Sequence, residues 1–252
     1  MNSLLVIGKG ITGKATSAIL DSKVDFHDPA KGDIVEDYTD YCYAFICVPT
    51  PSLAGATYDY RHVEDVFVDL LKGGFRGIAV IRSTCDPEFL LKMCEIYEKT
   101  IYWPEFLRER HYIDDALNPE NVVIGGPEKL TDSLVSLLKK NKHKLLAYWK
   151  VTDIVTASII KLGLNASLAS KIAMFNSIRE VCENTGADWE TVRSVIANDS
   201  RIGEGQTFVP GPDKKRGFGG KRLPKDLRTF KKLAKENVYL DSIIVYNNKI
   251  RN

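Results

Sequence analysis

Leu4-Leu5-Val6-Ile7-Gly8-Lys9-Gly10-Ile11-Thr12-Gly13, near the start of the chain, is the stretch that decides the fold. Four apolar residues predict a buried strand, and the glycines after them have the spacing G-x-G-x-x-G. Gly8 permits a tight turn, Gly10 lets backbone approach a pyrophosphate, and Gly13 lets helix and strand pack closely. The N-terminus of the following helix would bind the phosphates. The stretch therefore predicts a strand, turn and helix that hold a dinucleotide.

Asp28 ends the next apolar segment, 20 residues after Gly8. A carboxylate at this position accepts hydrogen bonds from the ribose hydroxyls of NAD and would repel the 2′-phosphate of NADP. We therefore expect NAD as the cofactor. The alternative is a glycine turn in a fold of the same type that holds no cofactor.

The first 150 residues alternate short apolar segments with helical patterns. This alternation predicts an α/β fold with a Rossmann-like, doubly wound parallel sheet. Strands are expected at 4–8, 24–27, 43–48, 78–83, 101–103 and 122–125, and helices near 12–22, 62–73, 86–98 and 127–142. We expect residues 1–150 to form an NAD-binding domain.

From about residue 152 to residue 184, apolar residues recur at helical spacing without a proline. At about 1.5 Å per residue, this predicts a helix close to 50 Å long. Further helices are expected at 189–198 and 224–236, so residues 151–252 should form an all-α domain built on the long helix. Because so long a helix needs a partner to cover its apolar stripe, we expect a homodimer through it.

The composition, 44% hydrophobic and 27% charged, is typical of a soluble globular protein. We find no signal peptide and no apolar run of the ~18 residues that span a bilayer, so we expect a cytoplasmic protein without a membrane partner. The five cysteines lack the spacing of a disulfide framework or a zinc site, and we expect no metal.

Residues 151–252 contain 17 Lys and Arg against 11 Asp and Glu. The excess of basic residues could bind an anionic ligand such as a diphosphate, or could form a solvated helical face. It lacks the dense basic stripe with interleaved aromatic residues that nucleic acid requires, so we expect no nucleic-acid partner.

Several further motifs follow one another along the chain: Phe45-Ile46-Cys47-Val48-Pro49-Thr50-Pro51, Arg82-Ser83-Thr84, Pro104-Glu105-Phe106-Leu107-Arg108-Glu109, residues 118–125, Lys161 with Asn165, residues 199–203, Phe208-Val209-Pro210-Gly211 and Gly217-Phe218-Gly219-Gly220-Lys221-Arg222-Leu223-Pro224-Lys225-Asp226. Together they resemble the UDP-glucose and GDP-mannose dehydrogenase family, from residue 1 to about 236. The resemblance implies an NAD-dependent oxidoreductase acting on the CH–OH group of a nucleotide sugar, with that sugar as the small-molecule partner.

The resemblance also implies roles for individual residues. Catalytic residues would be Thr84, Glu105, Lys161, Asn165 and Asp226. Cofactor contacts would come from Gly8, Gly10, Ile11, Thr12, Gly13, Asp28, Val48, Pro49, Thr50, Ser83, Thr84 and Lys225. Substrate contacts would come from Glu105, Phe106, Leu107, Arg108, Lys161, Asn165, Arg201, Phe208, Gly219 and Arg222. In the family, the residue matching Arg201 reaches from the neighbouring subunit, and the alternative for it is a surface arginine.

The chemistry of these residue types agrees with such roles. Lys161 and Asn165 lie four apart and share one face of a helix, so they can stabilise negative charge on an oxygen or orient a water. Lys161 alone could be a solvated charge, yet apolar residues flank it. Asp226 could act as a base or position a water, or could simply begin a helix, and Glu105 would supply a second carboxylate.

Arg222 departs from the family motif G-F-G-G-x-C-x-P-K-D, whose cysteine is the nucleophile for a second oxidation. Arginine cannot form the thiohemiacetal, so we expect a single hydride transfer. Cys85 is an alternative nucleophile, or a small core residue. The basic residues of 212–216, with Lys221 and Arg222, could hold phosphates or form a solvated loop tip.

The family normally continues into a third domain that binds the nucleotide sugar, whereas this sequence stops at Asn252. We expect a shortened member without that domain, unless a separate chain supplies it. Two other functions stay open. One is a β-hydroxyacid dehydrogenase, which has a similar length and a K-x-x-x-N site. The other is a catalytically silent subunit that binds NAD or a nucleotide sugar.

Overall fold

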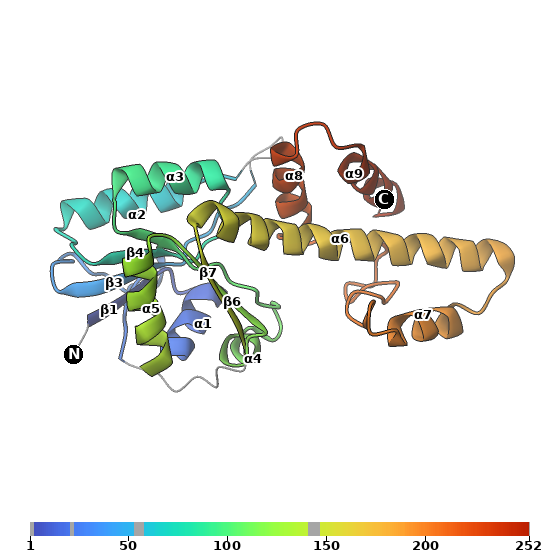
Figure 1. The fold of residues 1–252 in the computed structure, drawn as a ribbon, viewed down its shortest axis with the longest axis horizontal. Helices are drawn as coiled ribbons and strands as arrows, with labels where there is room; N and C mark the ends of the chain where they lie inside the picture. Colours follow the sequence, from blue (N-terminus) through green and yellow to red (C-terminus); the bar gives the residue numbers. More distant parts are fainter. Residues whose placement is uncertain (1–2, 21–22, 53–57, 141–146, 252) are drawn as a thin grey trace. The chain divides into compact units, whose positions relative to one another are not determined.

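The computed structural model describes residues 3–20, 23–52, 58–140 and 147–251, which form an α/β unit and a helical unit (Figure 1). The main division between the two compact units falls between Lys161 and Leu162. The domain boundary expected from the sequence, between residues 150 and 151, stays a prediction.

A seven-stranded sheet forms the centre of the first unit, in the order β2-β1-β3-β4-β5-β6-β7. All neighbouring strands are parallel except β5 and β6. The strands are β1 (Ser3–Ile7), β2 (Asp25–His27), β3 (Tyr41–Ile46), β4 (Ile78–Ile81), β5 (Thr100–Tyr102), β6 (Asn121–Gly125) and β7 (Tyr148–Thr152). The expected Rossmann-like doubly wound sheet is confirmed. The sequence did not predict β7, because it is an edge strand with exposed side chains and lacks the apolar run of a central strand.

Helices cover both faces of this sheet (Figure 1). They are α1 (Ile11–Leu20), α2 (Arg61–Lys72), α3 (Pro87–Ile96), α4 (Tyr112–Leu117) and α5 (Glu128–Lys140). One apolar layer lies between the sheet and α2 and α3, and a second lies between the sheet and α1, α4 and α5. The expected helix positions 21–22 and 141–142 lie outside the described residues.

Helix α6 (Ile154–Thr185) contains 32 residues and is the long helix expected from the sequence. Its first turns belong to the first unit, where Ile154 and Ala157 join the core beneath α2 and α3. Gly125 makes this approach possible, because a Cβ there would overlap Ala157. No helix in the described part of the chain is long and apolar enough to cross a membrane.

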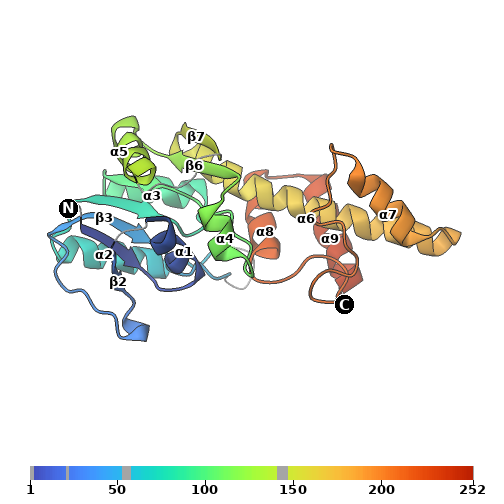
Figure 2. The same ribbon diagram turned by 90° about the horizontal axis from the view of Figure 1, so that it is seen from below.

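The second unit contains most of α6 together with α7 (Trp189–Asn198), α8 (Leu223–Leu233) and α9 (Val238–Arg251) (Figure 2). Its core joins small residues of α6 to larger ones of α8, α9 and the loop before α8: Ala166, Ala169, Ala173, Phe218, Leu227, Leu240 and Ile243. The all-α unit built on one long helix is confirmed. Helix α9 was not expected from the sequence, and it forms one wall of this core.

Candidate functional site

The glycine turn between β1 and α1 is fixed by close backbone contacts. A Cβ on Gly13 would overlap the carbonyl oxygen of Gly8, and one on Gly8 would lie 2.9 Å from the carbonyl oxygen of Cys47. Gly8 also has a φ of 92°, which side-chain-bearing residues rarely adopt. By contrast, in the described part of the chain no atom beyond the neighbours of Gly10 in sequence lies within 4 Å of where its Cβ would be. The turn is therefore closely packed at Gly8 and Gly13 and open at Gly10, where the backbone can approach a phosphate.

Asp28 follows β2, beside the glycine turn. Its Oδ2 accepts a hydrogen bond from the backbone N–H of Lys9 at 2.8 Å and lies 3.2 Å from Nζ of Lys31. The bond from the Lys9 amide, aided by Lys31 and opposed by burial, holds the pKa of Asp28 below its ordinary value. The carboxylate is therefore ionised at neutral pH, which fits an acceptor for ribose hydroxyls. These contacts and the open Gly10 show that the residues present fit NAD.

The end of β3 meets the glycine turn at the point where the strand order reverses, and the end of β4 contacts the end of β3. Ser83 donates from its hydroxyl to the carbonyl of Val48 at 2.6 Å, and Thr50 donates to the carbonyl of Thr84 at 3.0 Å. Pro49 lies between Val48 and Thr50 in the chain. In open α/β sheets, ligands bind outside the carboxyl ends of the strands at such a reversal. The structure thus brings together the predicted cofactor residues of three strands.

Glu105 and Lys161 form a buried pair in the first unit. Nζ of Lys161 donates to the backbone carbonyl of Glu105 at 2.5 Å and lies 3.5 Å from Oε1. Oε2 of Glu105 accepts from the backbone N–H of Leu107 at 2.6 Å, and the ring of Phe106 lies 5.3 Å from Nζ. Both charged side chains are at most 7% exposed. Lysine and glutamate side chains are rarely buried to this extent, and a buried pair of this kind is a candidate for a functional site.

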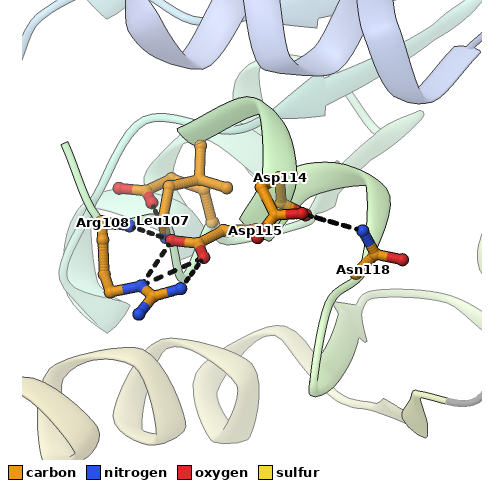
Figure 3. A network of polar contacts seen from close by, with 6 residues as sticks. Leu107, Arg108, Asp114, Asp115 and Asn118 are labelled. Carbon is orange, nitrogen blue, oxygen red and sulfur yellow. Dashed lines mark hydrogen bonds and ion pairs between the residues drawn. The ribbon is translucent and has the colours of Figure 1, made fainter. Parts of the chain in front are cut away.

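Arg108 follows this pair and is oriented by Asp115 of α4 (Figure 3). Its Nη2 donates to Oδ1 of Asp115 at 2.5 Å, and its backbone N–H donates to Oδ2 at 2.6 Å. Asp114 likewise accepts a bond from Asn118 at the end of the same helix. These bonds hold the loop after Glu105 against α4, and they leave the Arg108 guanidinium at the surface.

Asn165 and Asp226 form the corresponding pair in the second unit. Nδ2 of Asn165 donates to Oδ2 of Asp226 at 2.6 Å, and Nζ of Lys225 lies 3.8 Å from Oδ1. The Asp226 side chain is almost fully buried in the first turn of α8. A carboxylate held in this way can accept a hydrogen bond from a substrate hydroxyl or a water.

The loop Gly217–Gly220 before α8 is held by two buried asparagines from other helices. Asn247 of α9 accepts from the N–H of Phe218 at 2.7 Å and donates to its carbonyl at 3.1 Å. Asn176 of α6 accepts from the N–H of Gly217 at 3.1 Å. Gly219 contacts the Arg251 guanidinium so closely that a Cβ would overlap it. Arg222 then ends the loop as the residue before α8.

Two predicted substrate residues lie at the surface of the second unit. Arg201 is 86% exposed at its side chain and pairs with Asp199, whose Oδ2 lies 2.6 Å from Nη2. Phe208 is half exposed, with the guanidinium of Arg193 4.2 Å from its ring centroid. The contacts of Arg201 and Phe208 are thus with Asp199 and Arg193.

Comparison with known proteins assigns the chain to a family. The NAD-binding-domain model of the UDP-glucose/GDP-mannose dehydrogenase family matches residues 30–142, and the central-domain model of the same family matches residues 155–250. The chain belongs to the UDP-glucose/GDP-mannose dehydrogenase family. The NAD cofactor expected from the sequence is confirmed by the first of these matches.

Individual relatives agree with this family. The UDP-glucose 6-dehydrogenase of Rickettsia bellii is 34% identical over 212 residues, which cover 80% of the chain and 46% of that protein. The chain spans about half the length of the curated relatives it matches. A UDP-glucose dehydrogenase from Pyrobaculum islandicum shares the fold, with a TM-score of 0.82 at 23% identity, covering 99% of the chain and 68% of that structure.

The fold is also shared outside the family. The 3-hydroxyisobutyrate dehydrogenase of Mycobacterium tuberculosis has a TM-score of 0.75 at 16% identity, and the match covers 99% of the chain and 93% of that structure. At this identity the likeness shows the fold alone. The family assignment therefore rests on the sequence matches.

Sequence reasoning missed the residues that hold this family member's glycine-rich loop. Asn247 lies in α9, beyond the last helix that the sequence predicted. Ile243 and Ile250 flank Asn247 at helical spacing, so an apolar face with one asparagine in it was readable. The bonds from Asn247 to Phe218 could not be predicted from the sequence, since they join positions 29 residues apart.

Proposed function

We propose that this family member is an NAD-dependent oxidoreductase that transfers one hydride from the CH–OH group of a nucleotide sugar. The buried Lys161–Glu105 pair carries the proposal, because a cation kept out of water at the end of a dinucleotide-binding sheet is suited to stabilise developing oxyanion charge. Bound NAD supplies the hydride acceptor. The side chains of this chain bind the sugar and move its proton.

Lys161 would stabilise the negative charge that develops on the sugar oxygen as the alcohol proton leaves. Asn165 lies one helical turn further along α6, and its amide holds the carboxylate of Asp226. Asp226 would accept the proton, directly or through a water. Loss of that proton and of one hydride leaves an aldehyde, so a single step is balanced without a covalent intermediate.

Arg222 limits the reaction to this one step. A guanidinium stays protonated at neutral pH and cannot attack an aldehyde as a thiolate does. Among the described cysteines, Cys47, Cys85 and Cys182 are buried, and Cys85 is fully enclosed in the sheet core. None of the cysteines lies in the loop that precedes α8. These observations support oxidation to the aldehyde, and not to the acid.

The test compares the natural chain with Arg222→Cys, and uses Arg222→Ser as the control that removes the arginine without adding a thiol. With UDP-glucose and NAD, we expect the natural chain to form one NADH per sugar together with an aldehyde that hydroxylamine traps. Arg222→Cys should gain a second NADH and the acid, and Arg222→Ser should not. Two NADH per sugar from the natural chain would contradict the proposal. NAD binding without turnover on any nucleotide sugar would indicate the silent subunit.

A small hydroxy acid is the second candidate substrate, because β-hydroxyacid dehydrogenases share the K-x-x-x-N spacing of Lys161 and Asn165. The motif around Pro104 and the loop before α8 favour the nucleotide sugar. Turnover of 3-hydroxyisobutyrate with a higher kcat/KM than UDP-glucose would move the proposal to this second substrate.

We also propose a homodimer through α6 in a reducing cytoplasm. Met174 and Val181 of α6 are more than half exposed although they are large and apolar, which supports a covered surface in solution. The five cysteines are all free thiols, as expected in a reducing compartment. Light scattering of the chain and of Met174→Glu tests the dimer, since a charge on this face should leave monomers.

A further inference from the structure

Arg82 is a fully buried arginine at the end of β4. Its side chain is 2% exposed, and it ranks among the largest enclosed side chains of the described chain. Removing a guanidinium from water is costly unless its charge and its N–H groups are matched. An apolar residue of similar size would cost less in such a core. The contacts of Arg82 should therefore explain why this buried position holds a charged residue.

The Arg82 guanidinium joins the cofactor helix to the strand that leads to Glu105. Nε donates to Oγ1 of Thr16 at 3.1 Å, and Nη1 donates to the backbone carbonyl of Trp103 at 3.0 Å. The guanidinium also stacks on the Trp103 ring, 3.6 Å from its centroid. The Thr16 hydroxyl in turn donates to the carbonyl of Thr12, at the start of α1. One side chain thus links α1, the helix that follows the dinucleotide turn, to the end of β5.

Arg82 and Lys161 hold the same short segment at two neighbouring points. Arg82 binds the carbonyl of Trp103, and Lys161 binds the carbonyl of Glu105, two residues further along. Between them the chain turns so that the Glu105 carboxylate accepts the Leu107 N–H. Two cations therefore fix the backbone on either side of Pro104, and this sets where the Glu105 carboxylate points.

Two ionisable side chains of this cluster, Arg82 and Cys47, differ in charge at neutral pH. Burial lowers the pKa of Arg82 to about 10, with Cys47 and Glu105 acting against the shift, so the guanidinium stays cationic at neutral pH. Burial raises the pKa of the Cys47 thiol to about 11, so the thiol stays neutral. The guanidinium of Arg82 and the ammonium of Lys161 thus both lie against the segment that carries Glu105.

We propose that Arg82 is a positioning residue for the Glu105–Lys161 pair, holding the segment from Trp103 to Glu105 in register with the helix that binds the dinucleotide. It acts through the Trp103 carbonyl and touches neither substrate nor cofactor. The inference rests on the proposed function of the pair, and goes beyond it by assigning a buried residue outside the predicted site. Lysine at this position would keep the charge but not the planar fork that reaches two acceptors.

The kinetic test uses Arg82→Met, Arg82→Lys and the control Tyr43→Phe. Tyr43 donates to or accepts from Ser133 at 2.6 Å in the same apolar layer, far along the chain from Glu105, so its loss reports a merely structural cost. We expect Arg82→Met to lower kcat about 10- to 100-fold while the KM for NAD changes by less than about threefold. Arg82→Lys keeps the charge but not the fork, so it should recover only part of the kcat. An unchanged kcat in Arg82→Met, or an equal loss in Tyr43→Phe, would overturn the assignment.

A second measurement needs no turnover. Amide hydrogen exchange over residues 100–108 should speed up by about tenfold or more in Arg82→Met and less in Thr16→Val, which removes the acceptor of Nε together with the hydroxyl's own bond to the Thr12 carbonyl. Tyr43→Phe should leave this segment unchanged. If Arg82→Met does not fold, Thr16→Val carries the test, and unchanged exchange in it sinks the inference. An inactive natural chain with the expected exchange would refute the proposed function and leave the positioning role standing.

Discussion

Two glycine-rich segments open helices in this molecule, the turn Gly8–Gly13 before α1 and the loop Gly217–Gly220 before α8, and they are held in different ways. The turn is held by backbone pressed on backbone, with Gly8, Gly13 and Cys47 in contact. The loop is held by side chains of distant helices, Asn176 and Asn247. A turn fixed by sterics tolerates no change, whereas a loop fixed by side chains can change at one position, such as Arg222, and keep its shape.

Gly13→Ala should have the largest effect, because the new Cβ would lie 1.9 Å from the carbonyl oxygen of Gly8 and the backbone of the turn would have to shift. We expect a loss of about 3 kcal/mol or more in the free energy of unfolding, measured by urea denaturation, and no detectable NAD binding. Gly10→Ala is the matched control, since the space around its Cβ is open. It should fold like the natural chain and bind NAD more weakly. A Gly13→Ala protein with natural stability would break the steric account.

Asn247→Ala should have an intermediate effect confined to the second unit. It removes the partner of both the N–H and the carbonyl of Phe218, which are buried, and two such losses cost about 2–4 kcal/mol. Thermal unfolding followed by calorimetry measures the loss, and the dissociation constant for NAD should stay unchanged. The neighbouring Asn248→Ala is the control, since that side chain is exposed. Equal losses in the two variants would show that the loop does not depend on Asn247.

Asp28→Asn should have the smallest effect on stability, and that effect should depend on pH. Because the pKa of Asp28 is lower in the folded chain than in the unfolded one, its contribution is present above the unfolded value of about 3.9 and is lost as pH falls through the folded value. The variant should therefore be less stable than the natural chain at pH 7 and equal to it in strong acid. NAD affinity at pH 7 should fall as well. A stability difference as large in strong acid as at pH 7 would contradict this linkage.

The sequence by itself determined the α/β unit that contains the glycine turn. A strand, a glycine turn and a helix are set by neighbours in the chain, and the resulting periodicity and glycine spacing can be read without a structure. The six strands expected from these patterns are all present within a few residues of their predicted bounds. The strand β7 was missed because an exposed edge strand leaves only a weak pattern.

Only the tertiary structure decided what holds the reacting residues. Pairing of Glu105 with Lys161 joins positions 56 residues apart, and pairing of Asn165 with Asp226 joins positions 61 apart. The resemblance to a family could propose these residues, but not the bonds between them. The burial of Arg82 against Trp103 and the two bonds from Asn247 to Phe218 had no signal in the sequence. The physical reason is that a hydrogen bond between side chains depends on where distant elements pack, and a local pattern records only its own helix or strand.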